Sequence, residues 1–140
     1  METQGLRSQT DVRDLSSRIR GGLTIELIRL DLENQTSGRA DTCVARLTGK
    51  LSLETVHGFL CMVRSEPAPY LVLDLSGVSF LDSAGVGALV SLFMNRRSIG
   101  KKLALAAVAQ QGIAILQVSR LVRFLPLYAS VDLAVQQFRT

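Results

Sequence analysis

A continuous apolar run at Tyr70–Leu75 is followed, after a few residues, by a helical pattern that begins at Ser83, and this succession most limits how the chain can fold. A run of this kind, broken only by Asp74 near its end, is typical of a strand that is covered on both faces. After Ser83, the residues Val86, Leu89 and Phe93 share one helical face. A buried strand that leads into an amphipathic helix is a unit of a sheet with right-handed crossovers. The sequence therefore predicts the α/β class.

The other elements follow from periodicity and from turn residues. We expect strands over 23–32, 42–48, 70–75 and 103–108, a short strand over 124–127, a turn over 76–81, and helices over 53–65, 83–99, 110–119 and 131–138. The first two strands are separated by polar turn residues and are expected to form a hairpin. The prediction is a mixed β-sheet of four to five strands with about four helices.

The length of 140 residues is that of a single domain, and a chain of this size buries roughly two-thirds of the surface that it exposes when unfolded. Residues 1–20 are polar and of mixed charge, and Gly21–Gly22 separate them from the apolar segments. We expect a polar N-terminal extension over 1–22, which forms either a mobile arm or a short marginal helix. The remainder, 23–140, is expected to form the domain.

The formal net charge of +4 raises the question of nucleic-acid binding. Near the N-terminus the basic residues alternate with acidic ones, and Arg96–Arg97 and Lys101–Lys102 flank the end of a predicted helix. Cations at a helix C-terminus oppose the negative pole of its dipole. Trp is absent, so there is little sign of a surface on which bases would stack. We interpret the basic pairs as solvated helix ends and expect no direct contact with nucleic acid.

The chain has few residues suited to metal binding or catalysis. Two cysteines, Cys43 and Cys61, are too few and too far apart in the sequence for a metal framework, and we expect them to be reduced. His57 is the single histidine, and no Ser/His/Asp or Cys/His arrangement accompanies it. The segment that contains Gly85 and Gly87 lacks the last small residue of a dinucleotide fingerprint. We predict no metal, no cofactor and no enzymatic activity, with a nucleotide-binding enzyme as the weakest alternative.

The N-terminal segment has no apolar signal region, and no apolar run approaches the ~20 residues that span a bilayer. We therefore expect a cytoplasmic protein without a membrane partner. The sequence Asn34-Gln35-Thr36 fits a glycosylation site, but without a secretory signal it is more simply a polar turn.

Asp82 and Ser83 stand where a helix is predicted to begin, and two interpretations are open. Both residue types are common helix caps, with a typical effect of ~1 kcal/mol. A hydroxyl beside the free amides of a helix start also lies in a field that favours negative charge, so it is suited to accept a phosphate. Gly85 and Gly87 either let a partner approach or pack the helix on its own sheet. Asp74 is either an acidic residue of the site or a cap of the following turn.

Three segments of the chain, taken in order, resemble the STAS domain family of bacterial anti-sigma factor antagonists. The sequence Asp74–Gly87 resembles the signature of the family, Leu47–Leu51 its passage from strand to helix, and 118–130 its C-terminal segment. The resemblance extends over residues 23–138 and implies a single STAS-like domain.

By this resemblance Ser83 is the phosphorylation site, and Asp82, Ser83, Ala84, Gly85 and Ser52 contact a partner protein. The implied partner is an anti-sigma factor that is also a serine kinase and carries the ATP, and a serine phosphatase reverses the modification. The implied function is that of a phosphoprotein in transcription regulation by partner switching. The unphosphorylated form binds the anti-sigma factor and releases a sigma factor, and phosphorylation of Ser83 prevents this.

The sequence departs from the family where the first helix is approached. Lys50 and Ser52 stand where many members carry acidic residues, so a charge contact in the partner complex is absent or reversed. Ala84 stands where a second hydroxyl is frequent, which matters less. The alternative function is that of a scaffold subunit, never phosphorylated, in a stress-sensing or lipid-transport complex. The switch predicts that Ser83→Ala keeps partner binding and that Ser83→Glu loses it, whereas the scaffold predicts similar binding by Ser83→Ala and the unmodified protein whether or not a kinase is present.

Overall fold

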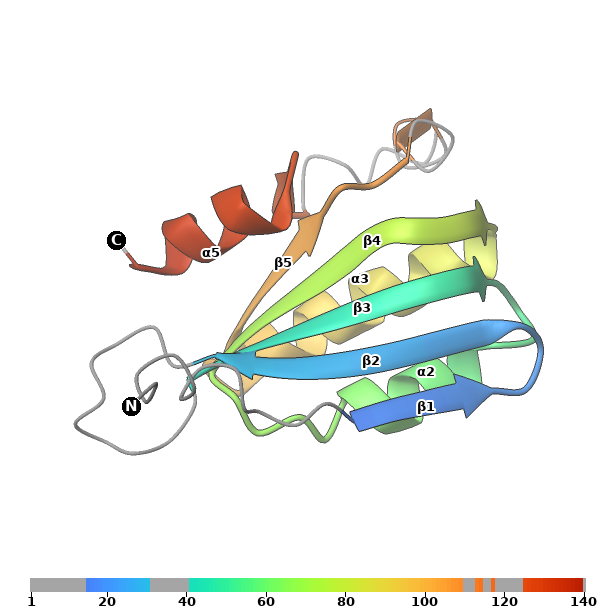
Figure 1. Cartoon of the computed structure of the whole chain (residues 1–140), viewed down its shortest axis with the longest axis horizontal. Coiled ribbons are helices and arrows are strands. Elements are labelled where there is room, and N and C mark those ends of the chain that lie inside the picture. Colours follow the sequence, from blue (N-terminus) through green and yellow to red (C-terminus); the bar gives the residue numbers. More distant parts are fainter. Residues whose placement is uncertain (1–14, 31–40, 110–112, 115–116, 118–124, 140) are drawn as a thin grey trace, which may run out of the picture.

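The computed structural model of the chain describes residues 15–30, 41–109, 113–114, 117 and 125–139. Within these residues, six strands form one sheet in the order of the sequence, and three helices pack against it (Figure 1). The strands are β1 (Leu15–Ile19), β2 (Leu23–Leu30), β3 (Thr42–Leu51), β4 (Tyr70–Leu81), β5 (Lys102–Ala106) and β6 (Leu127–Tyr128), and the helices are α2 (Val56–Val63), α3 (Ser83–Ser98) and α5 (Val131–Arg139). The predicted α/β class is confirmed, with more strands than expected.

The sheet is mixed, as predicted. β1 pairs with β2 and β2 with β3 in antiparallel fashion, which confirms the predicted hairpin of β2 and β3. The pairs β3–β4, β4–β5 and β5–β6 are parallel. Parallel neighbours require crossover connections, and α2 and α3 lie in the connections that follow β3 and β4. α3 therefore begins at the end of the sheet where β4 ends.

β4 is longer than predicted. The turn expected over 76–81 is wrong, because the strand continues to Leu81 and stays paired with β3 as far as Leu51. The pairing contains two register shifts, and irregularities of this kind bend a strand and increase its twist. A Cβ atom at Gly77 would lie 2.8 Å from the carbonyl oxygen of Leu47. Gly77 therefore allows two strands to approach closely in the segment that we expected to be a turn.

Four other expectations differ from the structure or lie partly outside it. Residues 15–19 were expected in an arm or a marginal helix, but they form β1 at the edge of the sheet. The helix expected over 53–65 begins only at Val56. Most of the helix expected over 110–119 lies outside the described residues, although residues 113, 114 and 117 are helical. The short strand expected over 124–127 lies slightly later, as β6.

The core has two parts, one on each face of the sheet. The larger lies between the sheet and the pair α2 and α3, and Figure 1 shows these helices together on one side of the sheet. The smaller lies where Val44, Val72 and Ala104 meet Ala134 of α5. In the larger part the side chain of Phe59 is fully buried, and its truncation to alanine would cost about 3–5 kcal/mol. Because both faces of the sheet are covered, β4 and α3 are held in a fixed position relative to each other.

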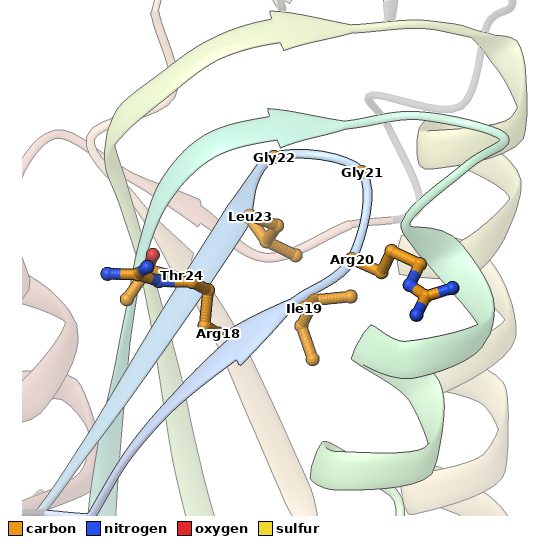
Figure 2. A pocket seen from close by; sticks show the side chains of 7 residues that line it. All are labelled: Arg18, Ile19, Arg20, Gly21, Gly22, Leu23 and Thr24. Carbon is orange, nitrogen blue, oxygen red and sulfur yellow. The ribbon is translucent and has the colours of Figure 1, made fainter.

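The turn between β1 and β2 lies against the segment that leads into α2 (Figure 2). Gly21 and Gly22 have φ angles of +105° and +104°, a region that other residues rarely adopt. A Cβ atom at Gly21 would lie 2.9 Å from Cγ2 of Thr55, and the backbone N–H of Lys50 donates to the carbonyl oxygen of Gly22 at 2.9 Å. Figure 2 shows Arg20 on the side of α2. This turn therefore supports the chain between β3 and α2.

The interpretation of the basic pairs as solvated helix ends is wrong for Arg96. Its side chain is buried, and it donates to the carbonyl oxygens of Lys102 at 3.0 Å, Ala68 at 2.6 Å and Glu66 at 3.4 Å. Burial lowers the pKa of Arg96. The side chain of Glu66, itself buried, pairs with Arg29. Arg96 thus joins the end of α3 to the loop before β4, whereas Arg97 and Lys102 are exposed as predicted and Lys101 is half-buried.

Candidate functional site

The end of β4 and the beginning of α3 are joined by Asp82, which caps the helix. Its Oδ1 atom accepts a hydrogen bond from the backbone N–H of Gly85 at 2.9 Å. Its Oδ2 atom accepts a second one, at 3.1 Å, from the backbone N–H of Leu53 in the turn that follows β3. A cap of this kind typically stabilises a helix by ~1 kcal/mol. Asp82 therefore connects α3 to the turn before α2 through its one carboxylate.

Ser83 is the first residue of α3, and it is exposed to solvent. α3 has 16 residues, so a full helix dipole has its positive end beside this hydroxyl. Free backbone N–H groups at such a position favour a nearby anion. Ala84 follows and is half-buried. The Ser83 side chain therefore lies at a surface where a negative charge is favoured.

The two glycines of α3 have different surroundings. Gly85 is buried, and a Cβ atom there would lie 2.2 Å from the carbonyl oxygen of Leu51 and 2.8 Å from Cδ1 of Leu81. Gly87 is exposed, and a Cβ atom there would have no neighbour within 4 Å among the described atoms. The close approach that Gly85 permits is therefore to the chain's own β3. We expected Gly85 to adjoin a partner, but Gly87 is the glycine that leaves open space at the surface.

Ser52, which we expected at the partner-binding surface, is also buried. Its backbone N–H donates to Oγ1 of Thr55 at 3.0 Å, and its carbonyl oxygen accepts from the N–H groups of Thr55 and Val56, both at 2.9 Å. Ser52 thus shapes the turn that leads into α2. Lys50, by contrast, is exposed.

Two large apolar side chains that we did not predict as site residues belong to segments next to Asp82. Leu53, whose N–H bonds to Asp82, is 74% exposed, and Phe80 is 50% exposed. Exposed apolar side chains that gather in one region are typical of interaction sites. Periodicity placed Leu53 at the start of a helix and Phe80 in a turn, so neither exposure was predicted. They were missed because both assignments were wrong.

Asp74 lies away from Ser83, within β4. Its Oδ1 atom accepts hydrogen bonds from the backbone N–H of Ser76 at 3.0 Å and from its hydroxyl at 2.8 Å, and its Oδ2 atom accepts from Nε of Arg46 at 3.2 Å. Burial raises the pKa of Asp74, but the bonds from Ser76 and Arg46 outweigh it, so the pKa is lowered. These contacts favour the structural interpretation of Asp74 over a role at the site.

The histidine and cysteine side chains that the structure describes do not form a catalytic or metal site. Sγ of Cys61 lies 3.6 Å from Nε2 of His57, one turn apart on α2, and Cys61 is exposed. Burial raises the pKa of Cys43 to about 12. Within the described ranges, no group of three or more His, Cys, Asp or Glu side chains is placed to hold a metal ion. No helix in the same ranges is long and apolar enough to cross a membrane.

Solved structures of other proteins resemble this chain. An anti-sigma factor antagonist from Mycobacterium paratuberculosis has a similar structure, with a TM-score of 0.68 and 21% identity over 90% of this chain and 100% of that one. Unphosphorylated SpoIIAA, an anti-sigma factor antagonist of Bacillus, has a TM-score of 0.61 and 20% identity, over 71% of this chain and 89% of its own. A sulfate transporter family protein from Wolinella succinogenes has a TM-score of 0.59 and 17% identity, over 77% and 100%.

These structures share the fold of the chain. The sequence itself matches the STAS domain family over residues 32–134, which include β3 to β6, α2 and α3. The matched region holds Asp82 and Ser83 and excludes β1 and β2. Since the match spans most of the 140 residues, the chain belongs to the STAS domain family.

Proposed function

We propose that this protein is an anti-sigma factor antagonist that is regulated by phosphorylation of Ser83. Its unphosphorylated surface binds an anti-sigma factor, which releases a sigma factor for transcription. The anti-sigma factor is also the serine kinase and supplies the ATP, and a serine phosphatase restores the binding form. The protein itself acts by binding and carries out no catalysis.

The observation that carries this proposal is the exposure of Ser83 at the first position of a long helix in a STAS domain. A kinase must reach the hydroxyl, and an exposed side chain at a helix start satisfies this requirement. SpoIIAA, which shares the fold, has been solved in both an unphosphorylated and a phosphorylated form. That protein is an anti-sigma factor antagonist, which supports the same role here.

The expected effect of a phosphate is on the surface and not on the fold. A phosphoserine adds a charge of about −1.5 to −2 and three acceptor oxygens. At the N-terminus of α3, the helix dipole favours this charge by about 0.3–2 kcal/mol, so the helix is retained. The carboxylate of Asp82 already occupies the N–H groups of Gly85 and Leu53, and the phosphate therefore adds to an anion at the same place.

The exposed apolar side chains Leu53 and Phe80 supply contact area for the partner beside this charge. Apolar contacts of this kind stabilise a complex only when water is removed from the region between the proteins. When the partner binds, a dianion on Ser83 would also have to lose its bound water. Each 1.4 kcal/mol of this free-energy cost weakens binding tenfold. Phosphorylation therefore prevents binding even though the domain stays folded.

The test uses the purified full chain and its cognate kinase. After incubation with ATP, the modified residue is mapped by mass spectrometry, and partner binding is measured for the unmodified protein, Ser83→Ala and Ser83→Glu. We expect phosphate on Ser83, unchanged binding by Ser83→Ala, and binding by Ser83→Glu that is at least tenfold weaker. Phosphate on another residue, or none, would contradict the proposed site.

Ser98→Glu is the matched control, because Ser98 is exposed at the other end of the same helix. It changes the net charge of the protein by the same amount as Ser83→Glu. We expect it to bind the partner as the unmodified protein does. Equal loss of binding in both glutamate variants would show an effect of overall charge, and equal binding in all variants would favour an unphosphorylated scaffold.

A further inference from the structure

A hollow lies at the opposite end of α3 from Ser83. It has a volume of about 710 Å³ and opens between the end of α3, the beginning of β5 and the last turn of α5. α3 rises about 1.5 Å per residue, so the Arg97 position is about 20 Å along the helix from Ser83. The hollow is therefore separate from the proposed phosphorylation site.

The rim of this hollow is positively charged. Arg97 and Lys102 line it and are exposed, and Lys101 lines it and is half-buried. Nζ of Lys101 lies 3.5 Å from the carbonyl oxygen of Glu66, and none of the three cations forms an ion pair with a carboxylate in the part of the chain that the structure describes. Arg97 also lies near the negative end of the α3 dipole, but Lys102 belongs to β5, where no such role applies.

The walls of the hollow are aromatic. Phe93, Tyr128 and Phe138 line it, and all three are half-buried. The ring of Phe138 stacks on Tyr70 with centroids 4.8 Å apart and an interplanar angle of 26°, which fixes one wall. Ring surfaces of this kind bind flat apolar groups, and they also accept a cation near their faces. Among the residues that the structure describes, no carboxylate side chain lines the hollow.

We propose that this hollow binds a small organic anion with a flat apolar body. The carboxylate or phosphate of such a ligand would lie at Arg97 and Lys102, and its apolar part would lie against Phe93 and Phe138. Binding sites for small molecules typically combine apolar walls with a few polar groups that fix orientation. Three cations that form no ion pair with a described carboxylate, beside aromatic walls, have this composition, and they select for negative charge.

The test uses the full chain and four probes that share one ring or one anion: 1-naphthyl phosphate, 1-naphthoate, the neutral 1-naphthol, and inorganic phosphate. Binding is followed by changes in amide chemical shifts. We expect the two naphthyl anions to shift Gly100, Lys101 and Leu103 and to leave Ser83 and Gly87 unchanged. The naphthyl compound that binds more tightly identifies the preferred anionic group, phosphate or carboxylate. Naphthol and inorganic phosphate should each bind at least tenfold more weakly, because each lacks one half of the interaction.

The double variant Arg97→Gln/Lys102→Gln should bind the naphthyl anions about tenfold more weakly, and higher salt should reduce the difference. The matched control is Arg18→Gln/Arg64→Gln, which removes the same charge from two exposed positions outside the hollow. It should bind as the unmodified protein does. Equal weakening in both double variants, shifts that fall outside the hollow, or no binding of either anion at millimolar concentration would overturn the proposal.

Discussion

Replacing the two glycines of α3 by alanine, one at a time, should change the stability of the domain in opposite directions. At Gly87 an added Cβ atom has no neighbour within 4 Å among the described atoms. Alanine is favoured over glycine inside a helix by about 0.8–1 kcal/mol, so Gly87→Ala should raise the free energy of unfolding by about that amount. For a chain of 140 residues this corresponds to an increase of about 3 °C in Tm.

At Gly85 the same change meets the backbone. The added Cβ atom would lie 2.2 Å from the carbonyl oxygen of Leu51, so the start of α3 must move away from β3. Forcing extra atoms into a packed region typically costs 1–3 kcal/mol, and the contact here is with backbone that cannot turn aside. We expect Gly85→Ala to lower the free energy of unfolding by about 2 kcal/mol after the helical gain of alanine is included.

Urea unfolding followed by circular dichroism measures both variants, and an unchanged m-value makes the difference a difference in stability. The expected gap between the two variants is about 3 kcal/mol. Equal stability of Gly85→Ala and Gly87→Ala would refute the assignment of Gly85 to packing on β3. Partner binding supplies a second readout: if the partner contacts α3 at the open position, Gly87→Ala is more stable than the unmodified protein and yet binds less well.

Three further predictions concern the polar groups that fix the site and the sheet. Asp82→Ala should lower the free energy of unfolding by about 1–2 kcal/mol through loss of the helix cap, and Asp82→Asn should lower it less, as urea unfolding would show. Arg96→Met should lower it by about 3 kcal/mol, because buried carbonyl oxygens lose their donor, and a near-neutral result would contradict this. The pKa values of Asp74 and Glu66 are lowered in the folded state, so the unfolded chain binds more protons in acid. The contribution of these two carboxylates to the free energy of unfolding should be fully present above the ordinary carboxyl range near pH 4 and should be lost as the pH falls below it. Asp74→Asn should reduce this pH dependence, as urea unfolding at a series of pH values would show.

The elements predicted correctly are those whose local pattern and tertiary environment agree. The apolar run of β4 is buried as expected, and the helical face of α3 packs on the core. The predictions failed where distant contacts decide the outcome. Residues 76–81 have the composition of a turn, yet pairing with β3 makes them strand. Leu15–Ile19 contain few apolar residues, but the edge of β2 was available to pair with them.

The site was predicted in part for the same reason. The helix start at Ser83 follows from local sequence, and the structure has α3 begin there. Whether a small residue faces solvent or a neighbouring strand depends on the angle between α3 and β3, which the sequence does not reveal. Gly85 and Gly87 therefore could not be told apart, and Ser52 was placed at the surface although its turn is folded inward. A charge pattern alone likewise could not distinguish buried Arg96 from its exposed neighbour.

The carboxylate of Asp82 bonds to the first turn of α3 and also to the turn at Leu53, which lies 29 positions before Asp82 in the chain. The proposed phosphorylation site, Ser83, therefore lies beside a frame of two hydrogen bonds that is present before any phosphate is added. A switch built on such a frame needs no structural relaxation between its two forms. The two forms would then differ in the charge at the surface, and the same domain could pass through many cycles of phosphorylation without partial unfolding.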